Sequence, residues 1–572
     1  MPVHNADIAD IFNQVADLLE IESDNPFRVR AYRNAARIVS SQSKSMTDRV
    51  DQGEDLTELP GIGKDLAEKI REIVKTGSLS FLKELERKTP SELSHLMKIG
   101  GLGPKRVKIL YEKLGISSLE ALKKAAQAGK ISLLKGFGEK TEQKILEEIG
   151  REKKEKRIKL VVAEEVANSL LRSLKKMKGV QEAVVAGSYR RRKETVADLD
   201  LLVTCQKDCE VMDHFVNYED VEKVVSKGDT RSTVLLRSGL QVDLRVVPQV
   251  SYGAALHYFT GSKAHNIAVR TLGVKKGIKI NEYGVFKRKS RIAGKSEEEV
   301  FKQVGLPYIE PELRENWGEI EAAQKGRLPH LITRKDIHGD LHVHTKETDG
   351  RNTLEDMVEA AKDRGYDYVA ITNHTKHVTV ARGLDAKETR KLMEKIDRLN
   401  GKVKGIAILK SAEVDILENG GLDLPDEVLR ELDLTVCAVH YKFNLSKEKQ
   451  TERILRAMEC SYFHILAHPS GRLINERDPY EVDMERLIEG AKERGCFLEL
   501  NAHPDRLDLT DIHCKRAKEM GIKIALATDA HSIGDLDFMR FGVDQARRGW
   551  LEPEDVLNTR SLKELKKLLK RA

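Results

Sequence analysis

The stretch AVVAGSYRRRKETVADLDLLVT, residues 183–204, decides the fold of the central part of this chain. It contains an apolar run, a Gly187-Ser188 turn, a basic cluster and a second apolar run that carries Asp198 and Asp200. Side chains at positions i and i+2 of a strand point to the same face, so both carboxylates can hold the same pair of cations. The stretch therefore predicts two strands joined by a tight turn, with a pair of acids beside that turn.

A third acid, Asp243, lies inside the apolar run LQVDLRVV at 240–247. A carboxylate in such a strand is costly unless it is paired or coordinates a metal. Three acids, two Mg²⁺ or Mn²⁺ ions and a Gly-Ser turn for a triphosphate are sufficient for in-line phosphoryl transfer. A group of edge-strand acids in a turn is the plainer alternative, and the full pattern favours the metal site.

The C-terminal part has a different signature, because 11 of the 17 histidines lie beyond residue 330. From residue 337 onward, apolar runs alternate with amphipathic helices, which predicts a parallel α/β barrel or a doubly wound sheet. Many histidines and acids follow the end of an apolar run, where parallel strands converge on one mouth. The candidate ligands are His342, His344, Asp349, His374, Glu413, His440, His468, Asp529 and His531.

Nine nitrogen and oxygen ligands from separate strands can hold two or three divalent ions such as Zn²⁺, Mn²⁺ or Fe²⁺. A single histidine at a strand end is usually a satisfied core residue, whereas nine ligands of this composition indicate a metal centre. His377, Arg382 and Arg472 are weaker candidates for phosphate contacts, and each could equally be a surface residue.

The first 150 residues are expected to be helical, and three related segments recur in them: LPGIGKDLAEKI (59–70), IGGLGPKRVKIL (99–110) and LKGFGEKTEQKIL (134–146). In each, Gly-x-Gly precedes an amphipathic helix, the helix-hairpin-helix pattern. One such pair could be a helix cap, but three predict that backbone N–H groups at helix starts contact DNA phosphates. We also expect a monovalent cation at these loops. The candidate DNA-binding glycines are Gly61, Gly63, Gly101, Gly103, Gly136 and Gly138.

The charges are uneven along the chain, whose formal net charge is +7. Residues 101–300 hold 40 Lys and Arg against 26 Asp and Glu, whereas the rest holds 59 against 66. A basic middle part suggests a channel that binds a polyanion. Solvated lysine-rich helix faces are the plainer alternative.

The cysteines and the hydrophobic pattern indicate the cellular compartment of the protein. Six cysteines are scattered without a CxxC pair, which is typical of reduced thiols rather than a disulfide frame or a zinc ribbon. No run of about 18 apolar residues and no secretory leader is visible, so we expect neither a membrane span nor export. A cytoplasmic protein of about three to five domains is the expectation for this length.

Two further segments, YFTGSKAHN (258–266) and INEYGVF (280–286), together with Arg270, complete a close resemblance to the family X DNA polymerases. The resemblance implies that Ser188 and Arg191 contact a dNTP triphosphate, and that Lys263, which stands where some relatives carry an acid, strengthens nucleotide binding. The nucleotide-binding residues implied are Gly187, Ser188, Arg191, Tyr258, Phe259, Gly261, Lys263, Asn266 and Arg270.

FRVRAYRNAARIV (27–39) with the first Gly-x-Gly segment resembles the small N-terminal domain of that family. Lys69 falls at the position of a lysine that in some members forms a Schiff base with a baseless sugar and eliminates the 5′ phosphate. Cationic neighbours such as Arg28, Arg33 and Lys64 favour a nucleophilic lysine, but Asp65 stands where a relative has a basic residue. The sequence leaves this lyase activity open.

The histidine pattern resembles the PHP (polymerase and histidinol phosphatase) domain, a distorted (β/α)7 barrel with a trinuclear metal site. Fusion of this domain behind a family X core is typical of bacterial and archaeal members. The resemblance covers essentially the whole chain and implies a 3′→5′ exonuclease, with AP-endonuclease or 3′-phosphatase activity as further options.

Together the motifs predict a multidomain chain with helical helix-hairpin-helix domains, an α+β nucleotidyltransferase palm and a C-terminal α/β barrel. The predicted ranges are 1–80 for a lyase-like helical domain, 81–150 for a second helix-hairpin-helix domain, 151–260 for the palm, 261–315 for a nucleotide-binding and template-checking subdomain, 316–335 for a linker and 336–572 for the PHP domain.

The function implied is the filling of short gaps in base excision repair by a monomer that binds gapped or nicked duplex DNA and dNTPs, with 3′ ends trimmed at the second site. A PHP phosphoesterase with a DNA-tethering first half is one alternative, and the intact acid triad disfavours it. A non-enzymatic DNA-end scaffold predicts eroded ligands. Small-molecule nucleotidyltransferases share the Gly-Ser and Asp-x-Asp signature but need neither three hairpin motifs nor the YFTG segment.

Overall fold

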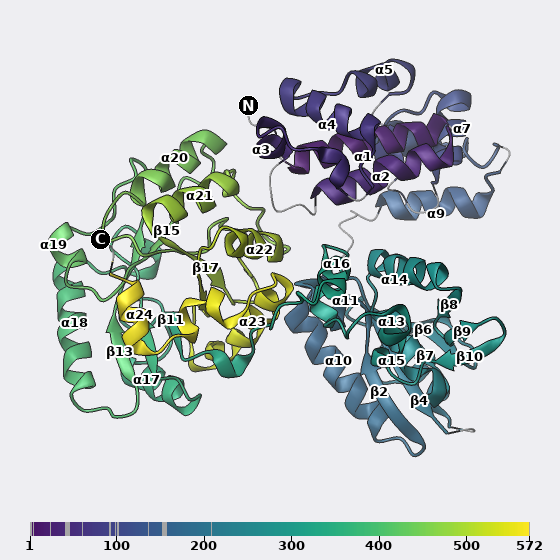
Figure 1. The fold of residues 1–572 in the computed structure, drawn as a ribbon. Coiled ribbons are helices and arrows are strands. Elements are labelled where there is room, and N and C mark those ends of the chain that lie inside the picture. The colour runs from purple at the N-terminus through teal and green to yellow at the C-terminus, as the bar shows by residue number, and fades with distance from the viewer. Residues whose placement is uncertain are drawn as a thin grey trace. The chain divides into compact units, whose positions relative to one another are not determined.

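The computed structural model describes residues 3–570 apart from 4, 23, 41–45, 60, 91–92, 98, 100–101, 135, 151–156 and 207–208. The chain divides into two compact units, an N-terminal unit (Met1–Lys156) and a C-terminal unit (Arg157–Ala572), and many of their elements are labelled in Figure 1. The predicted palm, template-checking and PHP domains therefore pack into one body. Among the described residues, no helix is both long and apolar enough to cross a lipid bilayer.

The N-terminal unit is helical throughout its described part, as the sequence predicted. The apolar spacing of its first helix places Ile8, Val15 and Leu18 in the core with no exposed surface, which is the expected result of a 3.6-residue period. Its elements are α1 (Asn5–Glu22), α2 (Pro26–Ser40), α3 (Met46–Asp51), η1 (Leu56–Glu58), α4 (Lys64–Thr76), α5 (Ser80–Lys88), α6 (Leu93–Leu96), α7 (Pro104–Leu114), α8 (Leu119–Gln127) and α9 (Glu139–Gly150).

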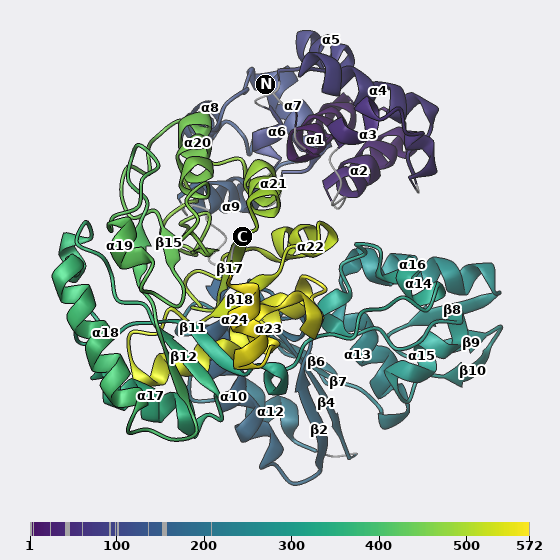
Figure 2. The same ribbon diagram turned by 60° about the vertical axis from the view of Figure 1, so that its left-hand side comes forward.

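The palm is a five-stranded sheet in the order β2-β4-β7-β6-β5, in which only β4 and β7 are parallel neighbours. Figure 2 shows α10 running beside this sheet. A two-stranded ribbon of β1 and β3 precedes the strand with the acids. The elements are β1 (Ile158–Lys159), α10 (Leu160–Lys175), β2 (Val180–Val185), α11 (Gly187–Arg190), β3 (Thr195–Val196), β4 (Asp198–Cys205), α12 (Val211–Val216), β5 (Val221–Ser226), β6 (Arg231–Leu236) and β7 (Gln241–Val246).

A smaller subdomain follows, in which the antiparallel sheet β10-β9-β8 packs with three helices. Its elements are η2 (Gln249–Ser251), α13 (Tyr252–Thr260), α14 (Lys263–Lys275), β8 (Ile278–Asn281), β9 (Gly284–Lys287), β10 (Ser290–Ala293), α15 (Glu297–Val304) and η3 (Pro311–Leu313).

Residues 316–335, which the sequence indicated as a linker, are folded and packed rather than extended. They form α16 (Glu319–Gln324) and η4 (Arg334–Asp336). Ile320 and Ala323 lie in the core of the preceding subdomain, whereas Ile332 lies in the core of the barrel. The apolar side chains of this segment therefore join the two domains that it connects.

The C-terminal domain is a barrel of parallel strands. β11-β12-β13 and β14-β15-β16-β17-β18 form two parallel sheets. Isolated bridges between His374 and Glu413 and between Val343 and Ala530 link these sheets end to end. β13 and β14 succeed each other along one course of chain, so the closed ring has seven strand positions. The barrel alternative is thus confirmed over the doubly wound sheet.

Helices surround the barrel strands, as Figure 1 shows for α17 to α22. The elements are β11 (Gly339–Val343), α17 (Leu354–Asp363), β12 (Tyr368–Ile371), η5 (Thr379–Ala381), α18 (Ala386–Asn400), β13 (Ala407–Lys410), β14 (Glu413–Asp415), α19 (Asp426–Leu429), β15 (Val436–Ala438), α20 (Lys447–Ala457), β16 (Ile465–Leu466), α21 (Met484–Arg494), β17 (Phe497–Asn501), α22 (Asp511–Glu519), β18 (Ile524–Ala527), η6 (Ile533–Phe538), α23 (Met539–Arg548), η7 (Pro553–Asp555), η8 (Leu557–Thr559) and α24 (Leu562–Leu568).

Candidate metal centres

The three acids of the palm lie on one face of its sheet. In the parallel pair β4 and β7, Asp200 is the partner of Asp243, and Asp198 is the partner of Gln241. Asp198 and Asp200 are two residues apart in a strand and share a face, and paired neighbours in register point to the same side. All three carboxylates therefore project from the same surface.

The acids differ in how the protein compensates their charge. Burial, followed by the carboxylates of Asp198 and Asp243, raises the pKa of Asp200 to about 7. Burial also raises the pKa of Asp243, but hydrogen bonds from Thr233 (2.6 Å) and Gln241 (2.8 Å) outweigh it and lower that pKa. Asp243 is therefore held as a carboxylate by its hydrogen bonds, whereas the charge of Asp200 requires a nearby cation. Such a group of carboxylate oxygens fits Mg²⁺ or Mn²⁺.

Gly187 lets the turn approach this cluster closely. Its φ is +63°, and a Cβ added there would lie 2.5 Å from Oδ2 of Asp200. Since φ in this range is strained for residues with a side chain, both the turn and the carboxylate require glycine. Ser188 follows in the single turn of α11.

Arg191 lies next to this turn and is held by two partners. Its Nη1 donates to the carbonyl of Thr260 (2.6 Å) and its Nε donates to Glu315 (3.0 Å). A Cβ added at Gly261 would lie 3.2 Å from the same Nη1. The guanidinium therefore connects the turn beside the acids with the 258–261 segment.

The aromatic pair of the 258–261 segment packs edge to face. The rings of Tyr258 and Phe259 have centroids 5.1 Å apart at 82°, and Arg245 lies 4.4 Å above the Phe259 ring. Asn266 donates from Nδ2 to the carbonyl of Tyr258 (2.6 Å). The segment and the first turns of α14 are thus tied together.

Three of the residues implied in nucleotide binding share one face of α14. Lys263, Asn266 and Arg270 are separated by three and four residues, the spacing of neighbours on a helix surface. Lys263 and Arg270 are exposed, whereas Asn266 is half-buried. This face offers two cationic side chains and one amide.

A buried acid that the sequence did not single out, Glu297, supports the same region. Arg190 donates to both of its oxygens (2.9 and 2.6 Å) and Arg314 donates to Oε1 (2.5 Å). Burial raises the pKa of Glu297, but Arg190 and Arg314 lower it to about 2. In the sequence it is only the first of three glutamates at a helix start, so its pairing over more than 100 residues gave no local signal.

In the C-terminal domain, the nine candidate ligands converge on the carboxyl-terminal mouth of the barrel. Glu413 opens β14 directly after β13, and the remaining ligands lie at or beyond the ends of β11, β12, β15, β16 and β18. Three overlapping groups have ligand atoms within 4.8 Å of one another: His344, Asp349, His374 and His531; His342, His344 and Asp529; and His374, Glu413 and His440.

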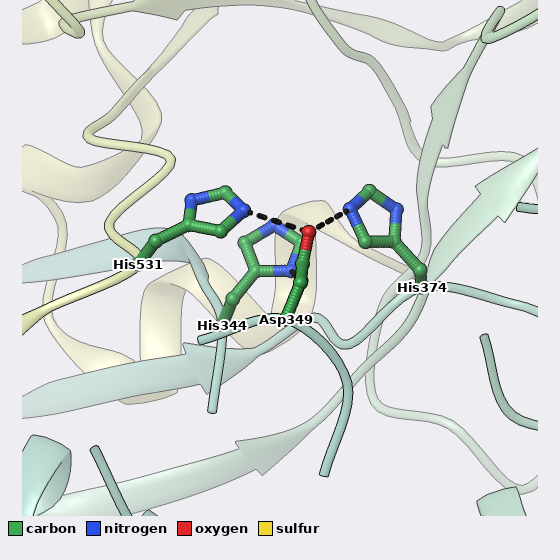
Figure 3. Close-up of side chains that lie close together, drawn as sticks. All are labelled: His344, Asp349, His374 and His531. Atoms are coloured by element: carbon green, nitrogen blue, oxygen red, sulfur yellow. Dashed lines mark ion pairs between the residues drawn. The ribbon is translucent and has the colours of Figure 1, made fainter. Parts of the chain in front are cut away.

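Figure 3 shows the first group, in which Asp349 lies between two imidazoles. Its Oδ2 is 3.3 Å from Nε2 of His531 and 3.4 Å from Nε2 of His374. His344 completes the group with Nδ1 at 3.7 Å from Oδ1 of Asp349. One carboxylate and three imidazoles around a small space match the ligands that zinc, manganese and iron accept.

Glu413 is the centre of the cluster. Its carboxylate lies 2.8 Å from His374, 2.9 Å from His468 and 3.1 Å from His440. Burial raises the pKa of Glu413, but His374 and His440 lower it, and the result lies well below the usual value. Burial and the neighbouring His531 and His374 lower the pKa of His344 to about 3, which keeps that ring in the neutral, ligating form.

Several ligand atoms of this cluster are buried without a hydrogen bond in the described part of the chain. Such atoms are rare in folded proteins because leaving them unpaired is costly, and a metal ion would satisfy them. They are Nδ1 of His344 and His468 and Oδ1 of Asp349. The donor set therefore fits divalent ions.

Two acids missed by sequence reasoning orient the ligands from behind. Glu499 accepts a hydrogen bond from Nδ1 of His342 (2.6 Å) and another from the backbone N–H of His468 (2.7 Å). Asp415 lies 3.2 Å from Nδ1 of His440. Carboxylates in this position fix the ring and raise its basicity toward a metal. Glu499 sits in the apolar strand FLELN, and that isolated charge was the available signal.

The weaker phosphate candidates have mixed environments. Arg472 does not face the mouth, since it donates to both oxygens of Glu194 in the palm (3.1 and 2.6 Å) and to two backbone carbonyls. The ring of His377 lies 4.3 Å from that of Tyr441. Arg382 is exposed directly after η5. Arg472 thus joins two domains, which its sequence context could not indicate.

The second glycine of each hairpin pair lies directly before a helix. Gly63 and Gly103 cap α4 and α7 and have no neighbour within 4 Å of an added Cβ. Gly138 precedes α9 and is equally open, whereas a Cβ at Gly61 would meet Ile38 at 2.8 Å. Gly136 has a φ of +92°. Gly101 lies outside the described residues.

Lys69 on α4 forms an ion pair with Asp65 one turn earlier. Its nitrogen lies 5.8 Å from the ring of Phe81, over which Arg28 also lies at 4.6 Å. Arg33 is paired elsewhere, with Asp17. Asp65 compensates the charge of the ammonium, which does not favour nucleophilic chemistry.

Family models match the chain in five consecutive segments. A helix-hairpin-helix domain matches residues 3–79, a SAM-like helix-hairpin-helix tandem 93–151, the DNA polymerase beta palm 157–248, the DNA polymerase beta thumb 255–315 and the PHP domain 340–503.

Whole proteins are similar as well. The DNA polymerase/3'-5' exonuclease PolX of Bacillus subtilis is 38% identical over 577 residues, which span 100% of both chains. Probable phosphatases of Thermoanaerobacter sp. (29% identical over 231 residues) and Caldanaerobacter subterraneus (28% over 247 residues) match 38% and 40% of this chain and 89% and 90% of their own. The full-length match and the order of the segments show that the chain belongs to the family X DNA polymerases with a C-terminal PHP domain.

Proposed function

We propose that this protein is a DNA-directed DNA polymerase that fills short gaps during repair, and that its PHP domain removes nucleotides from 3′ ends. One observation carries the proposal: a single chain holds two separate groups of side chains that could bind metal ions, three carboxylates in the palm and nine candidate ligands in the barrel. The similarity to a protein named as polymerase and exonuclease runs along the whole chain.

At the polymerase site, Asp198, Asp200 and Asp243 would hold two Mg²⁺ or Mn²⁺ ions. When bound, such ions lower the pKa of an attacking 3′ hydroxyl and neutralise charge at the transferring phosphorus. The chain itself contributes orientation, because Gly187 brings the turn against Asp200 and Ser188 follows at the place for the triphosphate. Arg191 supplies a positive charge beside that turn.

The nucleotide would lie between that turn and α14. Tyr258 and Phe259 would pack beside the sugar, and Asn266 and Arg270 would reach the minor-groove edge of the base pair. Lys263 is exposed on the same face of α14, and its charge would strengthen dNTP binding before template pairing.

The helix-hairpin-helix loops would hold the duplex on both sides of the gap. Their open glycines and helix N-termini suit phosphate contacts that do not depend on sequence, and a monovalent cation would bind at the same loops. Gapped or nicked duplex and dNTPs are therefore the expected partners of a monomeric protein that works in the cytoplasm.

In the barrel, the nine ligands would hold two or three Zn²⁺, Mn²⁺ or Fe²⁺ ions. When bound, these ions activate water and stabilise the leaving oxygen in phosphodiester hydrolysis. Relatives that match 38% and 40% of this chain over 89% and 90% of their own length are named probable phosphatases, which favours removal of 3′ phosphates as a second activity. Cleavage at baseless sites is a third option for the same centre.

Lys69 is the candidate for 5′-phosphate elimination. Its pairing with Asp65 argues that such lyase activity is weak or absent. Borohydride trapping on DNA with a 5′ baseless sugar, with Lys69→Ala as the comparison, tests this point. A trapped adduct in the parent that the variant lacks would establish the lyase.

A one-nucleotide-gapped duplex with dNTPs and Mg²⁺ or Mn²⁺ separates the two activities. We expect Asp200→Asn to abolish extension and spare degradation, and His344→Ala to do the reverse. Loss of both activities in either variant would contradict two separate centres. An unaltered extension in Asp200→Asn would exclude the palm acids as the polymerase site.

The same protein preparations can show which kinds of DNA end or site the PHP domain cleaves. Duplexes that end in a 3′ phosphate or contain a baseless site are compared with a 3′-hydroxyl end. Cleavage that His344→Ala removes and Asp200→Asn retains would assign each activity to the barrel.

A further inference from the structure

Residues 190–194 of the palm, which lie between the Gly187-Ser188 turn and β4, are contacted by the PHP domain at three places. Arg548 reaches the backbone of Arg191, Asp544 lies 3.4 Å from Arg192, and Arg472 binds Glu194. The barrel therefore holds the short palm segment that separates the triphosphate turn from the catalytic acids.

Arg548 makes the most buried of these contacts. It is the last residue of α23, and its side chain is 1% exposed. Its Nη1 donates to the carbonyl of Arg191 (2.7 Å) and to Glu315 (3.2 Å), and its Nη2 donates to Asp511 (2.5 Å). A buried arginine between two acids and a carbonyl is fixed in position and costly to remove.

Glu315 is shared between domains. It accepts from Arg548 and from Nε of Arg191 (3.0 Å), and Lys193 lies 3.6 Å away. Burial raises the pKa of Glu315, but Arg548 and then Arg191 lower it, so the carboxylate is ionised. Because Arg548 takes part of this charge, the guanidinium of Arg191 keeps positive charge that a triphosphate can use.

We propose that Arg548 of the PHP domain is a positioning residue for nucleotide binding in the polymerase site. It acts through Arg191 in two ways. Its hydrogen bond fixes the backbone carbonyl of Arg191, and its ion pair holds Glu315 so that this acid orients the guanidinium of Arg191 without neutralising it. The inference rests on the proposed contact between Arg191 and the triphosphate.

The neighbouring residue, Arg547, provides a matched control. It lies on the same helix, is also largely buried, and donates to Glu312 (2.7 Å) and to the carbonyl of Ile332 (3.2 Å). Its contacts thus also join α23 to the segment before the barrel, but none of its hydrogen bonds or ion pairs in the described residues reaches 190–194.

The experiment uses full-length Arg548→Lys, Arg547→Lys and Arg191→Lys proteins. Lysine keeps the charge at position 548 but lacks the planar guanidinium, so it cannot donate to the carbonyl of Arg191 and to both acids at once. We expect Arg548→Lys to raise the KM for dNTP on a one-nucleotide gap about 10-fold, the scale of a lost charged hydrogen bond, with kcat and 3′→5′ degradation unchanged. Arg547→Lys should leave all three parameters unchanged.

Two further variants test the same role of Arg548. Asp511→Asn removes the charge that anchors Arg548 from the barrel side and should raise the KM about threefold. The double variant of Arg191 and Arg548 should bind dNTP no more weakly than Arg191→Lys alone, because both act through one guanidinium.

The variants distinguish the positioning role of Arg548 from the proposed contact between Arg191 and the triphosphate. If Arg191→Lys leaves the KM for dNTP unchanged, the proposed triphosphate contact is wrong. If Arg191→Lys raises it but Arg548→Lys and Asp511→Asn do not, the positioning role is overturned. An equal loss of kcat and degradation in Arg548→Lys, with no separate KM effect in Asp511→Asn, would mean that the residue only stabilises the fold.

Discussion

The palm cluster and the barrel cluster both gather acidic or imidazole side chains, but they are built differently. The palm brings together three carboxylates from two adjacent strands, and burial, followed by the charges of Asp198 and Asp243, raises the pKa of Asp200 to about 7. The barrel gathers nine candidate ligands at six strand ends, and acids and imidazoles among them lie within ion-pair distance of each other.

This difference indicates when each site takes up its metal ions. Carboxylates that repel each other bind cations most strongly when a triphosphate adds further oxygen ligands, so the palm depends on its substrate. The barrel cluster instead presents buried ligand atoms that have no hydrogen bond among the described residues, such as Nδ1 of His344 and Nδ1 of His468. We infer that the barrel retains ions without DNA, whereas the palm acquires them with the nucleotide.

The largest effect is expected from Glu413→Gln, which keeps the shape of the side chain and removes the charge at the centre of the barrel cluster. Degradation of 3′ ends should fall by at least about 1000-fold, the scale for loss of a group that acts directly. Gap filling by the same preparation should be unchanged. The rates of both reactions on one gapped substrate provide the measurement.

Glu418→Gln is the control, because Glu418 is exposed five residues further along and lies near Lys442 rather than a ligand. If both glutamine variants degraded DNA at the parental rate, the barrel cluster would not be the nuclease centre.

Gly187→Ala should have the next largest effect, on the palm alone. The added methyl would lie 2.5 Å from the Asp200 carboxylate, so the turn and the acid must separate. We expect extension to slow about 100-fold, as misplacement of a reacting group by about 1 Å does, and degradation to persist.

Gly239→Ala separates this clash from backbone strain. Gly239 has a φ of +81° but no atom within 4 Å of an added Cβ. Strain of about 1–2 kcal/mol is expected in both variants, whereas only the change at Gly187 should slow extension. Equal rates in the two variants would show that the contact with Asp200 is unimportant.

The smallest effect concerns stability in metal-free protein. The folded-state pKa of Asp200 is raised, so its ionisation costs stability above pH 7, and this cost disappears as the pH falls toward the unfolded value near 4. Asp200→Asn should therefore raise the Tm by a few degrees at pH 8 and have little effect near pH 4. Thermal unfolding followed by circular dichroism in EDTA measures this.

Asp243→Asn should give the opposite sign. The folded-state pKa of Asp243 is lowered, so its charge stabilises the fold above the unfolded value, and that stability is lost as the pH falls through the folded value. The Tm of this variant should drop at pH 8. A drop of the same size for both variants would mean that the two acids share one environment.

Much of this architecture follows from local patterns. The spacing of Asp198 and Asp200 sets a common face because strand side chains alternate, and the barrel histidines converge because parallel strands end on one side. The apolar period of α1 predicts its buried residues for the same kind of reason.

Contacts between distant segments have no such local signal. Glu315 meets Arg548 across 233 residues, and Arg472 meets Glu194 across 278, so neither pair follows from a spacing rule. Residues 316–335 have the pattern of a linker, because they contain Pro329 and little strand pattern, which do not indicate the burial of Ile320 and Ile332. Such pairings depend on how complete domains pack.

The most direct measurement is the divalent metal content of protein that has been desalted without DNA or nucleotide. We predict roughly two to three ions per chain in the parent and in Asp200→Asn, and a loss of at least about one ion in Glu413→Gln. A parent without bound metal, or an Asp200→Asn protein that loses as much metal as Glu413→Gln, would contradict a preassembled barrel centre that is independent of the palm.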